Sequence, residues 1–347
     1  MAIRTRISRR HLLSMSAAAG GLIAVGGHRA SSQTAKRIEQ YAPELDGIIS
    51  SSEPVQELAS GTGGTLGPTE GPLWWKEGGY LLYSDIHNNR RMKYVPGQGA
   101  SVAQEPVNRS NGLTRDLQGR LVACERVTRR VARQELDGSI TVIAGSFQGR
   151  QLNIPNDVVV KSDGSIYFSD PLGAVTEQWD LGYPGVYRVS PDLGTMTLLA
   201  NDFVFPNGLA FSPDERTLYI TDFRRGVIRA FDVAPNGTLA KQTDRIFADL
   251  RGAEPGGPDG MKVDVAGNVF CGGSGGIYIL DPKGKKLGRI VHGRPETTNI
   301  AFGGDDWKTL YFTNWNYLGA VKVKIAGIPV PVAKKSVTYT CGSMQWR

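Results

Sequence analysis

Six polar residues recur at equivalent points of a repeated phrase, and all six side chains carry oxygen donors. Carboxylate and amide oxygens are the ligands that hard cations prefer, whereas a dedicated zinc cage uses Cys and His. These donors therefore predict a site for one divalent cation, Ca²⁺ first, with Mg²⁺ or Mn²⁺ as alternatives, if the fold brings them to one axis. The phrases are TEGPLWW, SNGLTRD, PNDVVVK, PNGLAFS, PDGMKVD and TNIAFGG, and their leading polar residues are Glu70, Asn111, Asn156, Asn207, Asp259 and Asn299.

Taken singly, each of these residues has a simpler interpretation as a turn former. Pro258-Asp259-Gly260 is a common turn sequence, because proline presets φ and glycine tolerates φ above zero. Asn111 and Asn299, each alone, fit a turn-capping role better than a ligand role. The six-fold recurrence favours the cation site, because converging oxygen-bearing side chains, two of them anionic, need a positive charge to offset their desolvation.

The repeat also predicts the elements that must position these residues. Each polar residue stands 14 or 15 positions ahead of the end of a run rich in β-branched and aromatic residues. The run ends fall 40 to 52 positions apart, which fits one four-stranded blade per repeat and leaves no room for crossover helices. We therefore predict an all-β, six-bladed β-propeller over residues 51–347 with a metal site in its central channel; a β-sandwich or solenoid is the alternative. The six runs are YLLYSD, RLVACE, SIYFSD, TLYITD, NVFCGG and TLYFTN.

A third phrase, typical of an outer strand, precedes each polar phrase. Its first copy, VQELASG, has no preceding blade except the last one in the chain. We expect residues 55–59 to complete the C-terminal blade and close the ring, which would protect the free edges of the sheets.

The N-terminus has the pattern of an export signal. Ser8-Arg9-Arg10-His11-Leu12-Leu13 resembles the twin-arginine motif that directs folded proteins to the Tat translocase. A single membrane anchor is the alternative, but the apolar run over 12–27 is shorter than the ~20 residues that a span needs. We expect a signal peptide at 1–35, a linker at 36–50, and a periplasmic or secreted protein with no stable membrane span after export.

Charge and cysteine content indicate which binding partners and which metal or disulfide sites to expect. Removing residues 1–35 takes away five arginines and lowers the formal net charge from +7 to +2, so no nucleic-acid partner is expected. Cys124, Cys271 and Cys341 show no zinc-binding spacing. Cys124 and Cys271 fall in apolar runs and are expected to be buried free thiols, with one disulfide left open. The sequence gives no indication of the oligomeric state.

Four stretches carry a family resemblance: TEGPLWW, LNIPNDVVVKSDGSIYFSDP, PNGLAFSPDERTLYITD and PDGMKVDVAGNVF. Together they are similar to the gluconolactonase/senescence-marker-protein (regucalcin-like, SMP-30) family of six-bladed propellers, over nearly all of the chain after about residue 50. The resemblance implies a small-molecule lactone or ester substrate and hydrolysis of sugar lactones. It also implies a divalent metal, usually Ca²⁺ with Zn²⁺ among the alternatives, held by Glu70, Asn156, Asn207 and Asp259, with Asp259 as the general base.

One position departs from the family pattern. Some relatives have a substrate-contacting arginine two residues before the asparagine that matches Asn156; here that position is Ile154, and the nearest arginine is Arg150. Arg150 and His292, together with Asn111 and Asn299, are the candidate substrate-binding residues, although an ordinary surface role fits His292 as well. The insertion DPLGAVTEQWDLGYPG is the candidate segment for substrate selection.

Three alternatives concern the chemistry. Direct attack by Asp259 competes with its role as a base. The same metal site could serve a phosphotriesterase-like hydrolase, or the propeller could bind calcium or a ligand without catalysis. The match of GGSGG to a serine-hydrolase elbow is discounted, because a strand and a hairpin turn follow Ser274 instead of a helix.

Overall fold

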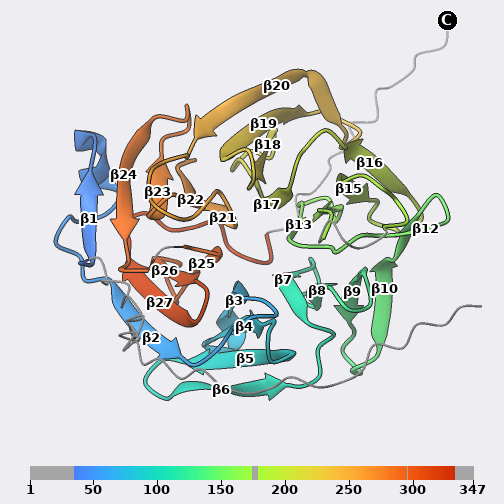
Figure 1. The fold of residues 1–347 in the computed structure, drawn as a ribbon, viewed down its shortest axis with the longest axis horizontal. Coiled ribbons are helices and arrows are strands. Elements are labelled where there is room, and N and C mark those ends of the chain that lie inside the picture. The colour runs from blue at the N-terminus through green and yellow to red at the C-terminus, as the bar shows by residue number, and fades with distance from the viewer. Residues whose placement is uncertain (1–34, 174–178, 295, 333–347) are drawn as a thin grey trace, which may run out of the picture. The chain divides into compact units, whose positions relative to one another are not determined.

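The chain folds into six small antiparallel sheets arranged around a central axis (Figure 1). The computed structural model describes residues 35–173, 179–294 and 296–332. Within these ranges the regular elements are strands, apart from two 3₁₀-helices, η1 Pro43–Gly47 and η2 Lys76–Gly78. The predicted six-bladed β-propeller is confirmed.

Each blade follows the repeat read from the sequence, and its strands pair in antiparallel order from the axis outwards. Blade 1 contains β3 Thr69–Trp75, β4 Tyr80–Asp85, β5 Arg90–Val95 and β6 Gly99–Gln104; blade 2 contains β7 Ser110–Arg115, β8 Leu121–Glu125, β9 Arg130–Gln134 and β10 Ile140–Ala144; blade 3 contains β13 Val158–Val160, β14 Ile166–Asp170, β15 Gly185–Val189 and β16 Met196–Ala200. Blade 4 contains β17 Pro206–Phe211, β18 Thr217–Asp222, β19 Val227–Val233 and β20 Leu239–Asp249; blade 5 contains β21 Met261–Val263, β22 Val269–Gly273, β23 Gly276–Leu280 and β24 Lys286–Val291; blade 6 contains β25 Asn299–Gly303, β26 Thr309–Thr313 and β27 Tyr317–Lys322. A separate hairpin joins β11 Ser146–Phe147 to β12 Arg150–Gln151.

The ring closes through the N-terminal part of the chain. Strand β2, Gln56–Ser60, pairs antiparallel with β27, so that Gln56 lies opposite Ala320 and Ser60 opposite Tyr317. This strand is the fourth of blade 6, as the first copy of the outer-strand phrase predicts. The first and last blades are thereby joined through the chain itself.

Residues 36–50, predicted to form a linker, are instead packed against blade 5 and the end of blade 6. Strand β1, Arg37–Gln40, adds a fifth strand to that sheet by pairing with β24. Arg289 donates from Nε to Glu39 Oε2 at 2.9 Å, and Leu45 of η1 is fully buried. The pairing covers the outer edge of β24, which gives this segment a structural role.

Apolar side chains fill the spaces between blades. Trp74 of blade 1 stacks on Tyr311 of blade 6, with ring centroids 5.6 Å apart. Cys124 and Cys271 are buried free thiols, as expected, and burial raises the pKa of both. The residues expected to form the signal, except residue 35, and Cys341 lie outside the described ranges. Among the described residues, no helix has the length and apolar character that crossing a membrane requires.

Candidate metal centre and active site

The six recurring polar residues all lie at the start of an inner strand, around the axis of the propeller (Figure 1). Four of them begin or nearly begin β3, β7, β17 and β25, while Asn156 and Asp259 stand two residues before β13 and β21. All six are buried, with between 2% and 9% of their surface exposed. The fold therefore places one oxygen-bearing side chain from every blade near one end of the channel.

Hydrogen bonds between neighbouring blades fix the backbone at these positions. Most of them end on the carbonyl of a recurring residue or of its immediate neighbour. The bonds run from Ser84 Oγ to Asn111 O at 2.8 Å, Gly112 N to Asn156 O at 2.8 Å, Ser169 Oγ to Asn207 O at 2.6 Å, Thr221 Oγ1 to Asp259 O at 3.1 Å, Gly260 N to Thr298 O at 2.8 Å, and Thr298 Oγ1 to Thr69 O at 2.6 Å. The side chains are thus held on a closed frame in which each blade orients the next.

Glycine follows several of the polar residues because the neighbouring blade lies in close contact there. A Cβ atom at Gly208 would stand 2.3 Å from Asp259 O, and one at Gly71 would stand 2.2 Å from Asn111 O. Gly71 also has φ of +51°, which side chains rarely adopt. These glycines are a packing requirement as well as a turn signal.

Four of the six side chains carry a buried oxygen atom without a hydrogen-bond partner: Oδ1 of Asn111, Asn156, Asn207 and Asp259. An unpaired buried oxygen costs free energy, and native proteins keep few of them. A hard cation would satisfy several at once. Among the described residues, no three His, Cys, Asp or Glu side chains are grouped closely enough to bind a metal, so a cation at this position must take amide oxygens as ligands. The donor set fits the expected divalent ion.

Asn299 differs from the other recurring amides. Its Oδ1 accepts from the backbone N–H of Ile300 at 2.8 Å, and its Nδ2 donates to Asp157 Oδ2 at 3.5 Å. The side chain also hydrogen-bonds to Glu70. Asn299 therefore orients two carboxylates and leaves no unpaired oxygen for a ligand.

The buried side chains of Glu70, Asp157 and Asp259 form a cluster in which the carboxylates repel one another. Burial, and then the charge of Asp157, raises the pKa of Glu70 to about 7. Burial and the charges of Glu70 and Asp157 hold the pKa of Asp259 well above its ordinary value, and a hydrogen bond from Asn207 opposes this shift. A bound cation would lower the pKa of both carboxyl groups, because it stabilises their ionised forms.

Two residues of this cluster were not predicted from the sequence. Asp157 follows Asn156 and is 2% exposed, and its Oδ1 accepts from the N–H of Val158 at 2.9 Å. Lys262 on β21 lowers the pKa of both Glu70 and Asp157. A signal for Asp157 was present: the third phrase reads PND where the fourth reads PNG, so an acid replaces the usual glycine.

The arginine and histidine candidates do not join the cluster. Arg150 lies on the exposed strand β12, which Figure 1 shows at the periphery of the ring. The guanidinium group near the third phrase belongs instead to Arg129, whose Nε donates to Leu152 O at 2.5 Å and to Asn153 O at 3.0 Å.

His292 is fully buried, so the ordinary surface role considered for it is wrong. Its Nε2 hydrogen-bonds with Thr297 Oγ1 at 2.7 Å, and its Nδ1 with the hydroxyl of Tyr317 at 2.8 Å. Burial lowers the pKa of His292 to about 3, which keeps the ring neutral. Ser274 is buried as well, and its hydroxyl donates to Glu254 O at 2.5 Å, which agrees with its exclusion as a nucleophile.

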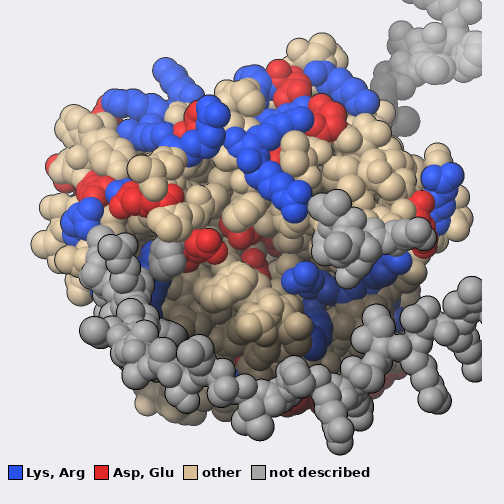
Figure 2. All heavy atoms as spheres, viewed as in Figure 1, with Lys and Arg blue, Asp and Glu red and all other residues tan. Residues whose placement is uncertain are grey.

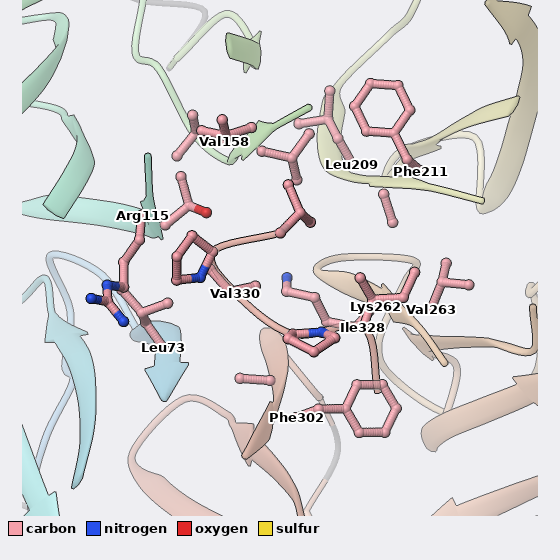
Figure 3. Close-up of a pocket in the computed structure, with 18 of the residues that line it drawn as sticks. Leu73, Arg115, Val158, Leu209, Phe211, Lys262, Val263, Phe302, Ile328 and Val330 are labelled. Carbon is pink, nitrogen blue, oxygen red and sulfur yellow. The ribbon is translucent and has the colours of Figure 1, made fainter. Parts of the chain in front are cut away.

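The two sides of the channel differ in character. Figure 2 shows acidic side chains at the centre of the face viewed, with Lys and Arg side chains around them. Further along the inner strands lies a cavity of about 450 Å³, whose walls include Leu73, Val158 and Leu209 (Figure 3). The segment with Ile328 and Val330 also lines this cavity. The cavity is mainly apolar, in contrast to the buried polar side chains at the starts of the inner strands.

Comparisons with known proteins agree with this geometry. The chain is 30% identical to a gluconolactonase from Zymomonas mobilis, over 93% of this chain and 99% of that protein. It is 31% identical to a pentonolactonase from Haloferax volcanii, over 70% of this chain and 80% of that protein. The fold is similar to that of a gluconolactonase from Xanthomonas campestris, with a TM-score of 0.75 and 28% identity over 84% of this chain and 96% of that one.

The family assignment rests on the extent of the match as well as on these relatives. The model of the SMP-30/gluconolactonase/LRE-like region matches residues 68–316, which include all six recurring polar residues. This chain belongs to the SMP-30/gluconolactonase/LRE-like family.

Proposed function

We propose that this protein is a lactonase that opens sugar lactones by hydrolysis and depends on one divalent metal ion, Ca²⁺ in the first place. The observation that carries the proposal is the set of four buried, unpartnered Oδ1 atoms at equivalent positions of four blades. Lactone hydrolysis is supported by the gluconolactonase and pentonolactonase relatives. A fold neighbour described as a calcium-binding regucalcin from Agrobacterium tumefaciens shares the propeller, at 19% identity and a TM-score of 0.67.

Glu70, Asn156, Asn207 and Asp259 are the residues that would hold the metal. When bound, the ion would supply a Lewis acid that polarises the lactone carbonyl and stabilises negative charge on its oxygen. Glu70 is oriented by the N–H of Gly71, which donates to its Oε2 at 2.9 Å. Asn299 holds the Glu70 carboxylate from the other side.

Asp259 is the general base of the proposed reaction. Its carboxylate is buried, its Oδ1 has no protein partner, and Asn207 hydrogen-bonds to it. The bound cation would keep this carboxylate ionised, as a group that takes a proton from an attacking water must be. The water oxygen then bonds to the carbonyl carbon, the ring C–O bond breaks, and the proton passes to the leaving alkoxide to give a hydroxy acid.

Asn111 is proposed to contact substrate. It lies between the blades of Glu70 and Asn156, and its Oδ1 is unpartnered. An amide oxygen at this point can accept a hydrogen bond from a sugar hydroxyl. The proposed contact explains why a buried asparagine occupies the second blade although the metal set does not include it.

The deciding experiment is a metal-titrated hydrolysis assay on several aldonolactones, with phosphotriesters in the same panel. We expect turnover of lactones that is lost on exhaustive chelation and restored by Ca²⁺. Full activity in a chelated, folded protein would overturn the metal dependence. Faster turnover of phosphotriesters would identify the alternative hydrolase, and binding without turnover would identify a non-catalytic propeller.

We also propose that the chain is exported by the Tat translocase and acts in the periplasm or outside the cell. The support is the Ser-Arg-Arg-His-Leu-Leu pattern at residues 8–13 and the loss of most excess positive charge with residues 1–35.

A further inference from the structure

Blade 1 has a buried arginine at a position where the other five blades have an aliphatic side chain. Arg91 is the second residue of β5, and it pairs with Ser84 of β4 and with Gln104 of β6. The residues at the place of Arg91 in the other blades are Val131, Val186, Ile228, Ile277 and Leu318, and their partners at the place of Gln104 are Ala144, Ala200, Ala248, Ile290 and Ala59. Blade 1 therefore replaces an aliphatic pair by an arginine and a glutamine.

The guanidinium group of Arg91 is only partly satisfied by the protein. Arg91 is 6% exposed; its Nη1 donates to Gln104 Oε1 at 2.8 Å, whereas its buried Nε has no hydrogen-bond partner. No ion pair joins it to any residue that the structure describes. Burial lowers the pKa of Arg91 to about 10, and the charge of Glu125 opposes this shift, so the group remains charged at neutral pH. A buried cation without a counter-charge costs free energy, which an anionic ligand would offset.

Arg91 lines a cavity of about 200 Å³ between blades 1 and 2, which are neighbours in the ring (Figure 1). Gln104 and Ile140 also line it, and both are exposed, so the cavity can be reached from the outer strands. A second guanidinium in the wall, that of Arg130, is already paired, because its Nε donates to Glu125 Oε2 at 2.7 Å. Arg91 is thus the arginine that this cavity leaves for a ligand.

We propose that this cavity binds a small organic monocarboxylate, whose carboxylate pairs with Arg91 and whose short carbon chain packs on the apolar part of the wall. The planar guanidinium group matches the two oxygens of a carboxylate. Val107, Leu121 and Ala123 form apolar wall, which favours a carbon chain over an inorganic anion such as phosphate. The carboxylate of Glu125 in the same wall disfavours a ligand with two negative charges.

The volume of the cavity limits the size of the ligand. Pockets for drug-sized molecules measure about 300–1,000 Å³, so a cavity of about 200 Å³ suits an acid of only a few carbon atoms. None of the six recurring polar residues lines this cavity. The proposed site is therefore separate from the metal centre, and its test does not depend on the proposed function.

The test uses the full protein and measures the dissociation constants of butanoate, butanamide and inorganic phosphate by isothermal titration calorimetry. We expect butanoate to bind at least about tenfold more tightly than butanamide, which lacks the charge, and more tightly than phosphate. In Arg91→Leu the affinity for butanoate should fall at least about tenfold. Leu318 occupies the equivalent position in blade 6, so leucine should be compatible with the fold. Lys93→Met removes the same charge from β5 outside the cavity and is the control.

Thermal unfolding separates a binding role of Arg91 from a structural one. Butanoate should raise the Tm of the wild type and of Lys93→Met but not that of Arg91→Leu. A wild type that binds no butanoate, or equal affinities in the wild type and Arg91→Leu, would overturn the site. Equal binding of butanamide, or tighter binding of phosphate, would overturn its assignment to a carboxylate.

Discussion

Thr298 Oγ1 donates a 2.6 Å hydrogen bond to the carbonyl of Thr69, a residue 229 positions earlier in the chain. Thr298 immediately precedes β25, and Thr69 begins β3, so this bond joins the inner strand of the last blade to that of the first. The oxygen donors next to these two residues, Asn299 and Glu70, are held in register across the ring closure. Their relative position therefore depends on contacts between the two ends of the chain.

Replacing Asp259 by Asn should remove turnover while the fold remains. The amide has the volume of the carboxylate but cannot accept the proton of the attacking water, so we expect kcat to fall by roughly 10²–10⁴-fold. Lactone hydrolysis and far-UV circular dichroism measure the two effects. Glu296→Gln, a change at a nearby, partly exposed acid, is the matched control. Near-normal kcat in Asp259→Asn would exclude its role as base.

Metal removal should lower thermal stability as well as activity. An ion that binds only the folded state stabilises it by about 2.7 kcal/mol when present at 100 times its dissociation constant. We expect the Tm measured by differential scanning calorimetry to rise when Ca²⁺ is added to the chelated protein. Asn207→Ala removes one of the unpartnered oxygens and should reduce this rise. An equal rise in both proteins would place the ion elsewhere.

Gly208→Ala should weaken the proposed metal site through the backbone. The added Cβ would stand 2.3 Å from Asp259 O and must push that residue out of position. We expect at least about a tenfold loss of Ca²⁺ affinity, because misplacement of a ligand by a fraction of an ångström disturbs the coordination. Gly47→Ala, whose Cβ would meet nothing within 4 Å, is the control. Unchanged affinity in Gly208→Ala would contradict the close approach.

The chelated protein should lose stability as the pH rises from about 4.5 to about 7. The pKa of Glu70 is raised from 4.5 to about 7 by burial and by Asp157, so the folded state holds more protons than the unfolded state in this range. The free energy of unfolding then falls with pH, and the contribution is complete below 4.5 and lost above 7. Urea titrations of the wild type and of Glu70→Gln, both in chelator, isolate this effect. A fall of the same size in Glu70→Gln would assign it to other groups.

The titration of His292 should make the free energy of unfolding rise with pH, which is the opposite of the effect of Glu70. Its pKa is lowered from 6.5 to about 3, so between these values the unfolded state holds more protons and the free energy of unfolding rises with pH. His292→Gln should therefore make the protein less sensitive to acid in urea titrations between pH 4 and 7. Its KM for lactones should remain that of the wild type, because the residue is buried away from substrate. A raised KM without loss of stability would return His292 to the binding site.

Export can be tested on the intact chain. Replacing Arg9 and Arg10 together by Lys keeps the charge but removes the arginine pair, so we expect the protein to remain in the cytoplasm. Fractionation of cells with an antibody against the propeller measures the distribution. Arg4→Lys, outside the motif, should be exported normally, and normal export of the double variant would contradict the Tat route.

The repeat made the blades and the candidate ligands predictable, because each phrase carries its own local signal. Glu70 and Asp259 could be placed at the same end of the channel from their equivalent positions in the repeat. Neither the place of Lys262 nor the burial of His292 could be predicted in this way. The partners of His292 include Tyr317, which lies 25 residues further along, so the burial of His292 depends on the fold. The four residues of β1 are too few for a periodic pattern, and only their pairing with β24 defines them as a strand.

The N-terminal strands also determine when the molecule can be completed during synthesis. Strand β1 pairs with β24 and strand β2 pairs with β27, so neither N-terminal strand can be paired until residues 286–322 have been made. During translation β1 and β2 have no partner strands, and their backbone groups must remain hydrated. The ring consequently closes only after nearly the whole chain has been synthesised. A premature stop before β27 would leave β2 without its partner and β26 without its outer neighbour.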